Sequence, residues 1–358
     1  MKYFKCLLSL SFMVVLFCTA CSQPSSDATD ATYTVTYVDG VDGAEIAVPS
    51  DTNRYKAGDT VTVNFTGVGS RDYYSFAGWS DGTTSYTSGS TTTFTMGSAN
   101  VTLTAQWQWN NSFIGTKAST AEKEVGDIVF NDGSAMPYTT FATLDTSAKN
   151  EKKAKAIALI FYKGTGLNSG SDTSTSRTLG VGLKHNKSGL AWCISSADAY
   201  DKNITTIQCP ATGSPGALTF TGDKDGSNNL EQIDAFEGVD DTSTAAKYPA
   251  FYFAKNYSTT ATNLGTNYAS GWYLPSLAEL FQIYANGKGT NKAFDIDAAS
   301  QALGGDKFED SWYWSSSQYA SGGSKAACHL GFSNGGWSSG GADKNGCLNY
   351  VCAIRAFN

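Results

Sequence analysis

The chain has 358 residues, which is enough for two or more domains. Its 25 Lys and Arg residues are outnumbered by 32 Asp and Glu residues, so the net charge is −7 and nucleic-acid binding has no electrostatic basis. Hydrophobic residues make up 41% and charged residues 16% of the chain, which excludes a largely disordered protein. Because there are two histidines and no His/Cys ligand spacing, a zinc or histidine-based enzyme is not expected.

The first 20 residues have the pattern of a signal peptide, in which a basic start precedes an apolar run from Cys6 to Cys18. The run is too short to span a bilayer as a helix. Its ending, Thr-Ala-Cys21, resembles the lipobox of bacterial lipoproteins, which implies that Cys21 is lipidated and begins the mature chain. The alternative is an ordinary secretory signal in which Cys21 has no role. Residues 21–32 are mostly polar, so we expect a flexible tether.

Residues 33–107 alternate apolar and polar side chains in short runs rich in Val, Thr and aromatic residues, which predicts β-strands. The expected strands are 33–37, 60–64, 92–96 and 100–104. Asp-Gly and Ala-Gly pairs between the runs indicate turns. The pattern therefore predicts a small, mainly-β module.

Three segments of this module resemble the Listeria–Bacteroides repeat, the internalin-type B-repeat of bacterial surface proteins. They are YKAGDTVTV (55–63), YSFAGW (74–79) and NVTLTAQW (100–107). The resemblance implies one spacer or adhesion unit at 33–107 without catalytic residues. We expect Phe76, Trp79 and Trp107 to pack in its core rather than to form a binding patch.

A segment expected to be a linker (108–124) precedes a second unit, 125–358, with short strands, few helices and long polar loops. The expected strands are 156–162, 178–183 and 190–193, and the expected helices are 229–236, 275–284 and 294–303. The second of these helices carries a capping box, because Ser276 precedes Glu279 by three residues. These patterns predict the α+β class.

Three motifs of the second unit occur in order: GWYLPSLAEL (271–280), SWYWSSS (311–317) and VCAIRAF (351–357). They resemble domains of the DUF1566 type and of the formylglycine-generating enzymes, which implies a C-type lectin-like fold for residues 125–358. The closest likeness is to the variable lipoproteins of treponemes, whose last segment is diversified by a retroelement. That likeness implies a lipoprotein anchored in the outer membrane and displayed on the bacterial cell surface.

An enzymatic role is not expected. The formylglycine-generating enzymes bind copper through two cysteines, and aligning the closing strand places these at Ala342 and Cys347, so one thiol is missing. Neither His185 nor His329 accompanies a nucleophile motif, and His329 is expected to be an exposed strand residue. We therefore predict no catalytic residue and no cofactor.

The loop 223–229 is rich in side-chain oxygens, but its glycine is misplaced for an EF-hand. We interpret the loop as a solvated Asx-rich turn, with a structural Ca²⁺ as the alternative. The motifs of Ca²⁺-dependent sugar-binding lectins are missing from the sequence. No metal ligand is therefore predicted.

Five cysteines follow Cys21, and an odd number leaves at least one of them unpaired in an exported protein. The expected disulfides are Cys193–Cys209 and Cys328–Cys352, which leave Cys347 over. The alternative is that all five are reduced and that the apolar ones pack in the core.

Residues 311–358 have an unusual composition, with no Glu or Pro, one Asp (Asp343) and eight Gly. Small polar residues lie between apolar blocks at 312–317, 328–332 and 351–357. A rigid scaffold that carries small, interchangeable loop residues is typical of a recognition surface. The alternative is a mobile Gly/Ser-rich surface loop.

The treponemal likeness also implies how such a segment varies. Adenine-directed mutation of Asn codons yields small and polar residues but not Lys, Trp, Gln, Glu or Met, so Lys325, Trp337 and Lys344 are expected to be constant. Tyr319, Trp337 and Tyr350 are the expected aromatic anchors for a ligand. The other candidate ligand-binding residues are Gly323, Ser324, Ala326, Gly331, Asn334, Gly335, Gly340, Asn345, Gly346, Cys347 and Asn349.

These expectations combine into a monomeric surface lipoprotein that binds a protein or a glycan through its terminal segment, with no nucleic acid as a partner. The first alternative is a fixed structural or adhesive envelope lipoprotein without sequence diversification. The second is an enzyme with a formylglycine-type site, which the missing cysteine opposes.

Overall fold

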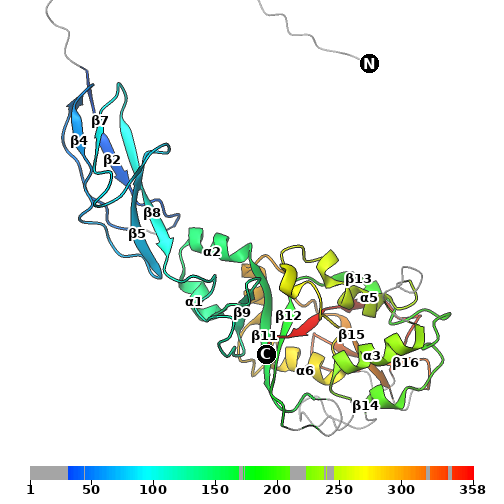
Figure 1. Ribbon diagram of the computed structural model, residues 1–358. Coiled ribbons are helices and arrows are strands. Elements are labelled where there is room, and N and C mark those ends of the chain that lie inside the picture. Colours follow the sequence, from blue (N-terminus) through cyan, green and yellow to red (C-terminus); the bar gives the residue numbers. More distant parts are fainter. Residues whose placement is uncertain are drawn as a thin grey trace, which may run out of the picture. The chain divides into compact units, whose positions relative to one another are not determined.

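The structure is a computed structural model, drawn in Figure 1. It describes residues 31–43, 45–168, 172, 174–209, 223–237, 239, 246–319, 323–337 and 341–358. The chain divides into two compact units. One comprises Met1–Val38, Val48–Gly67 and Gly78–Ala105, and the other comprises Asp39–Ala47, Val68–Ala77 and Gln106–Asn358.

The N-terminal region consists of short strands, blue to cyan in Figure 1. They are β1 (Thr32–Tyr33), β2 (Val35–Val38), β3 (Tyr55–Lys56), β4 (Thr60–Thr62), β5 (Tyr74–Ser80), β6 (Ser85–Tyr86), β7 (Thr93–Thr95) and β8 (Val101–Trp109). One sheet has the order β2-β8-β5-β6, while β1 pairs with β3 and β4 pairs with β7. The expected small β module is confirmed.

The alternating pattern of this module has the expected consequence for burial. In β2, Val35 and Tyr37 are buried while the intervening Thr36 is exposed. Trp79 is fully buried, and its ring meets that of Tyr37 edge-on at 4.7 Å between centroids. Trp79 is therefore a core residue, as the sequence predicts.

The second unit mixes strands and helices, so the α+β class is confirmed. Its strands are β9 (Asp127–Phe130), β10 (Ala135–Pro137), β11 (Ala156–Gly164), β12 (Arg177–Gly182), β13 (Asn186–Leu190), β14 (Gln208–Cys209), β15 (Trp312–Tyr319), β16 (Ala326–Gly331), β17 (Ala342–Asp343), β18 (Asn349–Val351) and β19 (Ile354–Ala356). Its α-helices are α1 (Tyr138–Thr143), α2 (Thr146–Lys153), α3 (Gly226–Glu237), α5 (Pro249–Lys255), α6 (Leu277–Gly287) and α7 (Ile296–Ala302). Short 3₁₀ turns are η1 (Thr205–Ile207), η3 (Tyr257–Thr259) and η4 (Thr266–Tyr268).

Two sheets organise this unit. The five-stranded sheet has the order β10-β9-β11-β12-β19, and the six-stranded sheet has the order β13-β18-β15-β16-β17 with β14 paired to β15. Helix α6 packs against β11 of the first sheet and against β15 and β16 of the second. The sequence explains this position, because Leu277, Leu280, Phe281 and Ile283 are all buried.

The capping box at the start of α6 is confirmed. The Ser276 hydroxyl accepts the backbone N–H of Glu279, and the Glu279 carboxylate accepts the backbone N–H of Ser276. The helix therefore begins where the sequence predicts, and its first turn is tied to its own side chains.

Two expected elements differ in the structure. Strand β13 ends at Leu190, so the expected strand 190–193 is wrong; Trp192 instead turns inward and donates its indole N–H to the Ser315 carbonyl. The expected linker 108–124 is held to the second unit: the backbone N–H of Lys117 donates to Ala135, and its ammonium lies 2.6 Å from Asp127 Oδ2. Local composition carried no signal for these long-range contacts.

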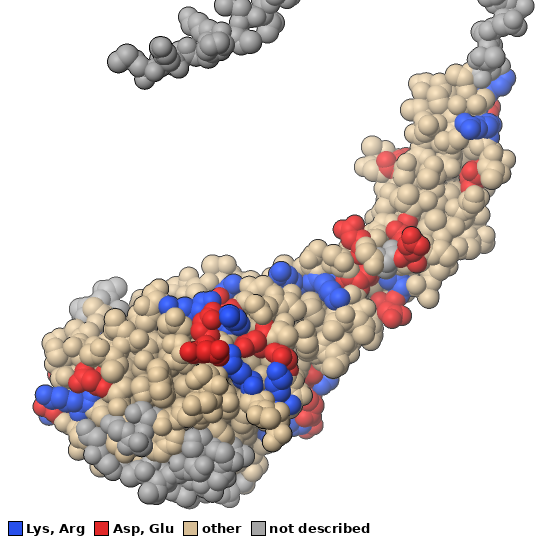
Figure 2. Space-filling model, turned by 180° about the vertical axis from the view of Figure 1, so that it is seen from behind, with Lys and Arg blue, Asp and Glu red and all other residues tan. Residues whose placement is uncertain are grey.

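Charges of both signs interleave on the face in Figure 2, and uncharged surface surrounds them. Ion pairs such as Lys187–Asp306 (3.1 Å) and Lys288–Asp297 (2.9 Å) belong to the second unit. Among the described helices, none combines the length and the apolar character needed to cross a membrane.

Candidate functional site

The first sequence motif of the second unit contains a fully buried carboxylate, Glu279, and contacts both other motifs. Its Oε2 accepts the backbone N–H groups of Gly226 and Ser276, at 2.9 and 2.8 Å. Its Oε1 accepts the Tyr273 hydroxyl at 3.1 Å. Because Tyr273 also exchanges backbone hydrogen bonds with Ile354, the first motif is joined to the closing strand.

A buried arginine faces this carboxyl group, whose pKa burial raises to about 7 against the opposing effect of the arginine charge. Arg177 Nη1 lies 3.2 Å from Glu279 Oε1 and 3.2 Å from Asp225 Oδ1, and Nη2 donates to the Tyr273 hydroxyl at 2.7 Å. Nη1 also donates to the Leu167 carbonyl. A buried charge with several partners of this kind fixes chain segments relative to one another.

The serines of the second motif are buried and face the loop 223–229. Ser317 Oγ donates to Asp223 Oδ2 at 2.6 Å, and Asn229 Nδ2 donates to the same oxygen and to Ser316 Oγ. Burial raises the pKa of Asp223 to about 6. Together, these side chains form the buried polar cluster: Arg177, Asp223, Asp225, Asn229, Tyr273, Glu279, Ser316 and Ser317.

The loop 223–229 works as a helix start. Asp225 Oδ1 accepts the backbone N–H of Ser227, so an Asx-type turn is present. The expectation that this turn is solvated is wrong, because Asp225 and Asn229 are buried and the second motif's serines cover the loop. Within the described residues, no group of three or more His, Cys, Asp or Glu side chains is placed to hold a metal ion. The buried polar cluster can therefore position backbone, and its carboxylates are engaged with protein donors.

The terminal segment, 311–358, follows the expected division between apolar blocks and small polar residues. Strands β15 and β16 contribute Tyr313, Trp314, Cys328 and Leu330 to the core, all fully buried. The candidate residues Gly323, Asn334, Asn345 and Gly346 are exposed, and Ser324, Trp337, Cys347 and Tyr350 are half-buried. Tyr319, Ala326, Gly331, Gly335 and Asn349 are buried, and Gly340 lies outside the described residues.

Burial changes the role of two of these candidates. Tyr319 is 6% exposed and packs edge-on against Trp337, so it supports that side chain rather than a surface contact. Gly335 has a φ of 69°, and a Cβ there would lie 2.3 Å from the Tyr284 ring. Gly335 is therefore a position that needs glycine.

Lys344 is fully buried, whereas Lys325 in the same segment is exposed. The Lys344 ammonium donates to the carbonyls of Ala199, Tyr200 and Ser324, at 2.7, 3.2 and 2.6 Å. Burial lowers its pKa to about 8. This lysine joins the turn before β16 to the loop around residue 200.

A surface cluster that we call the Trp312 patch consists of Trp312, His329 and Asn349, together with Leu348, the sequence neighbour of Asn349. Trp312 is 41% exposed, and its ring stacks on His329 with 4.2 Å between centroids. Asn349 Nδ2 lies 2.9 Å from His329 Nδ1, and Leu348, the residue before Asn349, is 64% exposed. The patch presents an indole face and an aliphatic side chain to solvent.

The sequence analysis missed this patch. His329 was expected to be exposed, but burial between Trp312 and Trp314 lowers its pKa to about 4, so it is neutral at pH 7. Trp312 was treated as part of an inward block. Period-two alternation gives no signal for its exposure, because Trp314, two residues on and on the same face of β15, is fully buried.

The five cysteines after residue 21 are free thiols in the structure, and neither expected disulfide is formed. Cys209 on β14 lies beside Cys328 on β16; their hydrogen bond, with burial, raises the pKa of Cys328. Cys193, Cys209, Cys328 and Cys352 are buried, and Cys347 is half-buried. The expected signal peptide and Cys21 lie outside the described residues.

Comparison with known proteins supports the N-terminal module. Residues 33–111 match the family model of the divergent InlB B-repeat domain. The search of the curated proteins found no match, and the search of the solved structures found none.

Proposed function

We propose that this chain is a lipid-anchored protein of the bacterial cell surface that binds a protein or glycan ligand through its terminal segment. The C-type lectin-like character of the second unit, the anchor at Cys21 and the diversification of residues 311–358 are parts of this proposal. The chain acts by binding and performs no catalysis.

The observation on which this proposal rests is that the terminal segment contains two kinds of position, buried packing residues and exposed turn residues. Its aromatic and apolar side chains pack in the core, while the exposed positions at Gly323, Asn334, Asn345 and Gly346 lie on turns between strands. Such turns can change side chains without changing the packing beneath them. The buried polar cluster supports the proposal further, because it ties all three motifs into one support.

The Trp312 patch supplies the contact energy that small turn residues lack. An exposed indole buries a large apolar area at little entropic cost when its rotamer is already held, here by stacking on His329. The exposed Leu348, which precedes Asn349 of the patch in the sequence, adds aliphatic area. Both features suit an apolar protein side chain or the C–H face of a sugar ring.

Sequencing the DNA that flanks this gene in several isolates tests the proposal. We expect a nearby reverse transcriptase and a second copy of the codons for the terminal segment that differs only at adenines. The differing codons should encode exposed turn residues such as Asn345, and the codons for Lys344 and Gly335 should stay constant.

The contrary result is a terminal segment that is invariant among isolates, with no second copy. That outcome would replace the proposal with a fixed structural or adhesive envelope lipoprotein. Differences that fall on adenines and other bases alike would overturn the diversification mechanism.

A further inference from the structure

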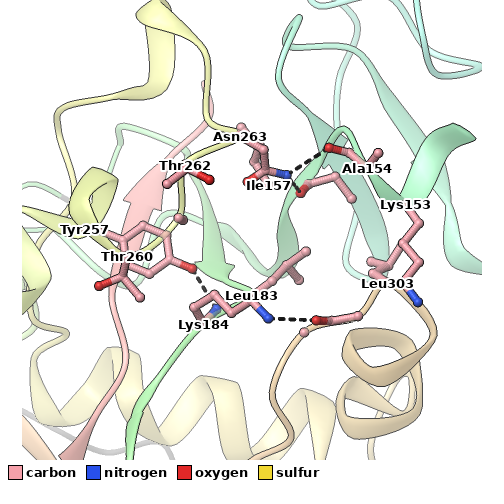
Figure 3. A pocket seen from close by; sticks show the side chains of 14 residues that line it. Lys153, Ala154, Ile157, Leu183, Lys184, Tyr257, Thr260, Thr262, Asn263 and Leu303 are labelled. Carbon is pink, nitrogen blue, oxygen red and sulfur yellow. Dashed lines mark hydrogen bonds between the residues drawn. The ribbon is translucent and has the colours of Figure 1, made fainter. Parts of the chain in front are cut away.

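A hollow of about 350 Å³ lies in the second unit, away from the residues of the terminal segment. Figure 3 shows it between the end of α2, the residues after β12, the residues after η3 and the residues after α7. Its size is at the lower end for small-molecule sites. Its lining residues are Lys153, Ala154, Ala156, Ile157, Leu183, Lys184, Tyr257, Thr260, Ala261, Thr262, Asn263, Leu303, Gly304 and Gly305.

Two lysine side chains approach the same glycine, Gly304, at the edge of this hollow. Lys184 Nζ donates to the Gly304 carbonyl at 2.8 Å, as the dashed line in Figure 3 marks. The Lys153 side chain reaches the same glycine, because a Cβ on Gly304 would lie 2.6 Å from Lys153 Cε and 3.4 Å from its Nζ. Both lysines carry positive charge, so they make the electrostatic potential at this edge of the hollow more positive.

Among the described residues, no carboxylate lines the hollow to balance these charges. Across the described part of the chain, neither Lys153 nor Lys184 takes part in an ion pair, whereas Lys187, three residues on, is paired with Asp306. The two lysines are thus available to an anion from outside, which they would bind with charge-assisted hydrogen bonds.

The remaining walls set the kind of ligand. Ile157, Leu183 and Ala261 provide an apolar floor. The Tyr257 hydroxyl accepts the backbone N–H of Lys184 at 2.7 Å, and burial raises its pKa, so it keeps its own proton to donate. The Asn263 amide NH₂ group does not donate to a ligand, because it already donates to the carbonyls of Ala154 and Ala156 (Figure 3).

We propose that this hollow binds a compact oxyanion, a carboxylate or phosphate monoester carried on an apolar body of about one ring. The anionic head lies beside the Lys184 ammonium, with Lys153 adding positive charge from the rim, and the ring lies over Ile157 and Leu183. The site uses none of the terminal-segment residues, so it goes beyond the ligand binding proposed above and does not depend on it.

Calorimetric titration of the full chain in detergent micelles tests this site with benzoate and phenyl phosphate, and with benzyl alcohol as the uncharged analogue. We expect saturable binding of at least one acid at low ionic strength and none of the alcohol. Which acid binds distinguishes a carboxylate site from a phosphate site. Lys153→Met and Lys184→Met should each weaken binding by about tenfold or more.

Lys155→Met is the matched control, because this exposed lysine lies two residues from Lys153 and outside the hollow. It should bind the acids like the unchanged chain. Thr262 is an exposed residue of the lining. Unlike the Lys155→Met control, Thr262→Phe should abolish binding, because its ring would fill the hollow that the ligand occupies. Equal losses in all three lysine variants, full binding in Thr262→Phe, or no saturable binding of either acid would overturn the proposal.

Discussion

At the residue scale, both histidine rings are largely buried, but they differ in their hydrogen-bond partners. His329 has Asn349 as a hydrogen-bond partner, while His185 is 8% exposed and its Nδ1 has no partner within the described residues. Burial lowers the pKa of His185 to about 4, against the opposing effect of the nearby Asp306 carboxylate. A protonated His185 is thus costly in the folded state.

His185→Leu should therefore change how stability depends on pH. Between pH 6.5 and about 4 the unfolded chain binds the proton and the folded chain does not, so His185 lowers the free energy of unfolding as the pH falls through this window. The full effect is about 3 kcal/mol. Urea unfolding of both proteins at pH 7 and pH 4.5 measures it.

The variant has a constant packing cost at every pH, so only the difference in slope is informative. Asp223, whose pKa burial raises to about 6, contributes the opposite slope but is present in both proteins and cancels. Parallel pH profiles of the variant and the parent protein would show that His185 is already solvated or paired in the folded chain.

At the element scale, α6 is the element best encoded by local sequence. Its capping box and apolar face both depend on residues within eleven positions, so short-range rules suffice. The tertiary structure adds a second use of Glu279, whose carboxylate also holds the start of α3 at Gly226 and the Tyr273 hydroxyl. One side chain therefore caps α6 and joins three elements.

Glu279→Gln should lower the free energy of unfolding by about 3 kcal/mol. The amide has one acceptor oxygen where the carboxylate has two, so its NH₂ must face either the N–H groups of Gly226 and Ser276 or the donors Tyr273 and Arg177. Burial raises the pKa of Glu279 to about 7, so urea unfolding at pH 8.5, where the carboxyl is ionised, measures the loss.

Glu231→Gln provides the control, since Glu231 is exposed on α3 and should change stability by less than about 0.5 kcal/mol. If Glu279→Gln is as stable as the control, the carboxyl oxygens are not both needed as acceptors. The buried polar cluster would then have a smaller part in holding the motifs together.

At the scale of the whole molecule, the terminal segment combines two kinds of position that alternate along the chain. Exposed turn residues such as Asn345 carry little packing, whereas Ala327 on β16 is fully buried between neighbouring side chains. A recognition surface that changes its side chains needs this separation, because each new side chain must leave the core intact.

Asn345→Tyr should leave the free energy of unfolding within about 0.5 kcal/mol of the parent protein. Ala327→Leu, which adds volume inside the core, should cost about 1–3 kcal/mol. Thermal and urea unfolding of both variants compare the two positions. A loss above about 1.5 kcal/mol for Asn345→Tyr would mean that the turn is part of the packed structure and does not tolerate exchange.

Several elements could be predicted because their signals are local. The strands of the N-terminal module follow from period-two alternation, and β11 follows from its continuous apolar run. The segment 190–193 is as apolar as a buried strand. Trp192, however, points into the core, where its indole N–H donates a hydrogen bond to the carbonyl of Ser315, far away in the chain. Composition alone does not distinguish these two outcomes.

For the candidate site, the sequence by itself determined that small polar residues alternate with apolar blocks in residues 311–358, because hydrophobic periodicity is a local property. Only the tertiary structure decided that Lys344 is buried among carbonyls, that Trp312 is exposed on His329, and that Lys153 and Lys184 both lie beside Gly304. Each of these facts depends on which distant segments become neighbours, and that is set by packing of the whole unit rather than by any one segment.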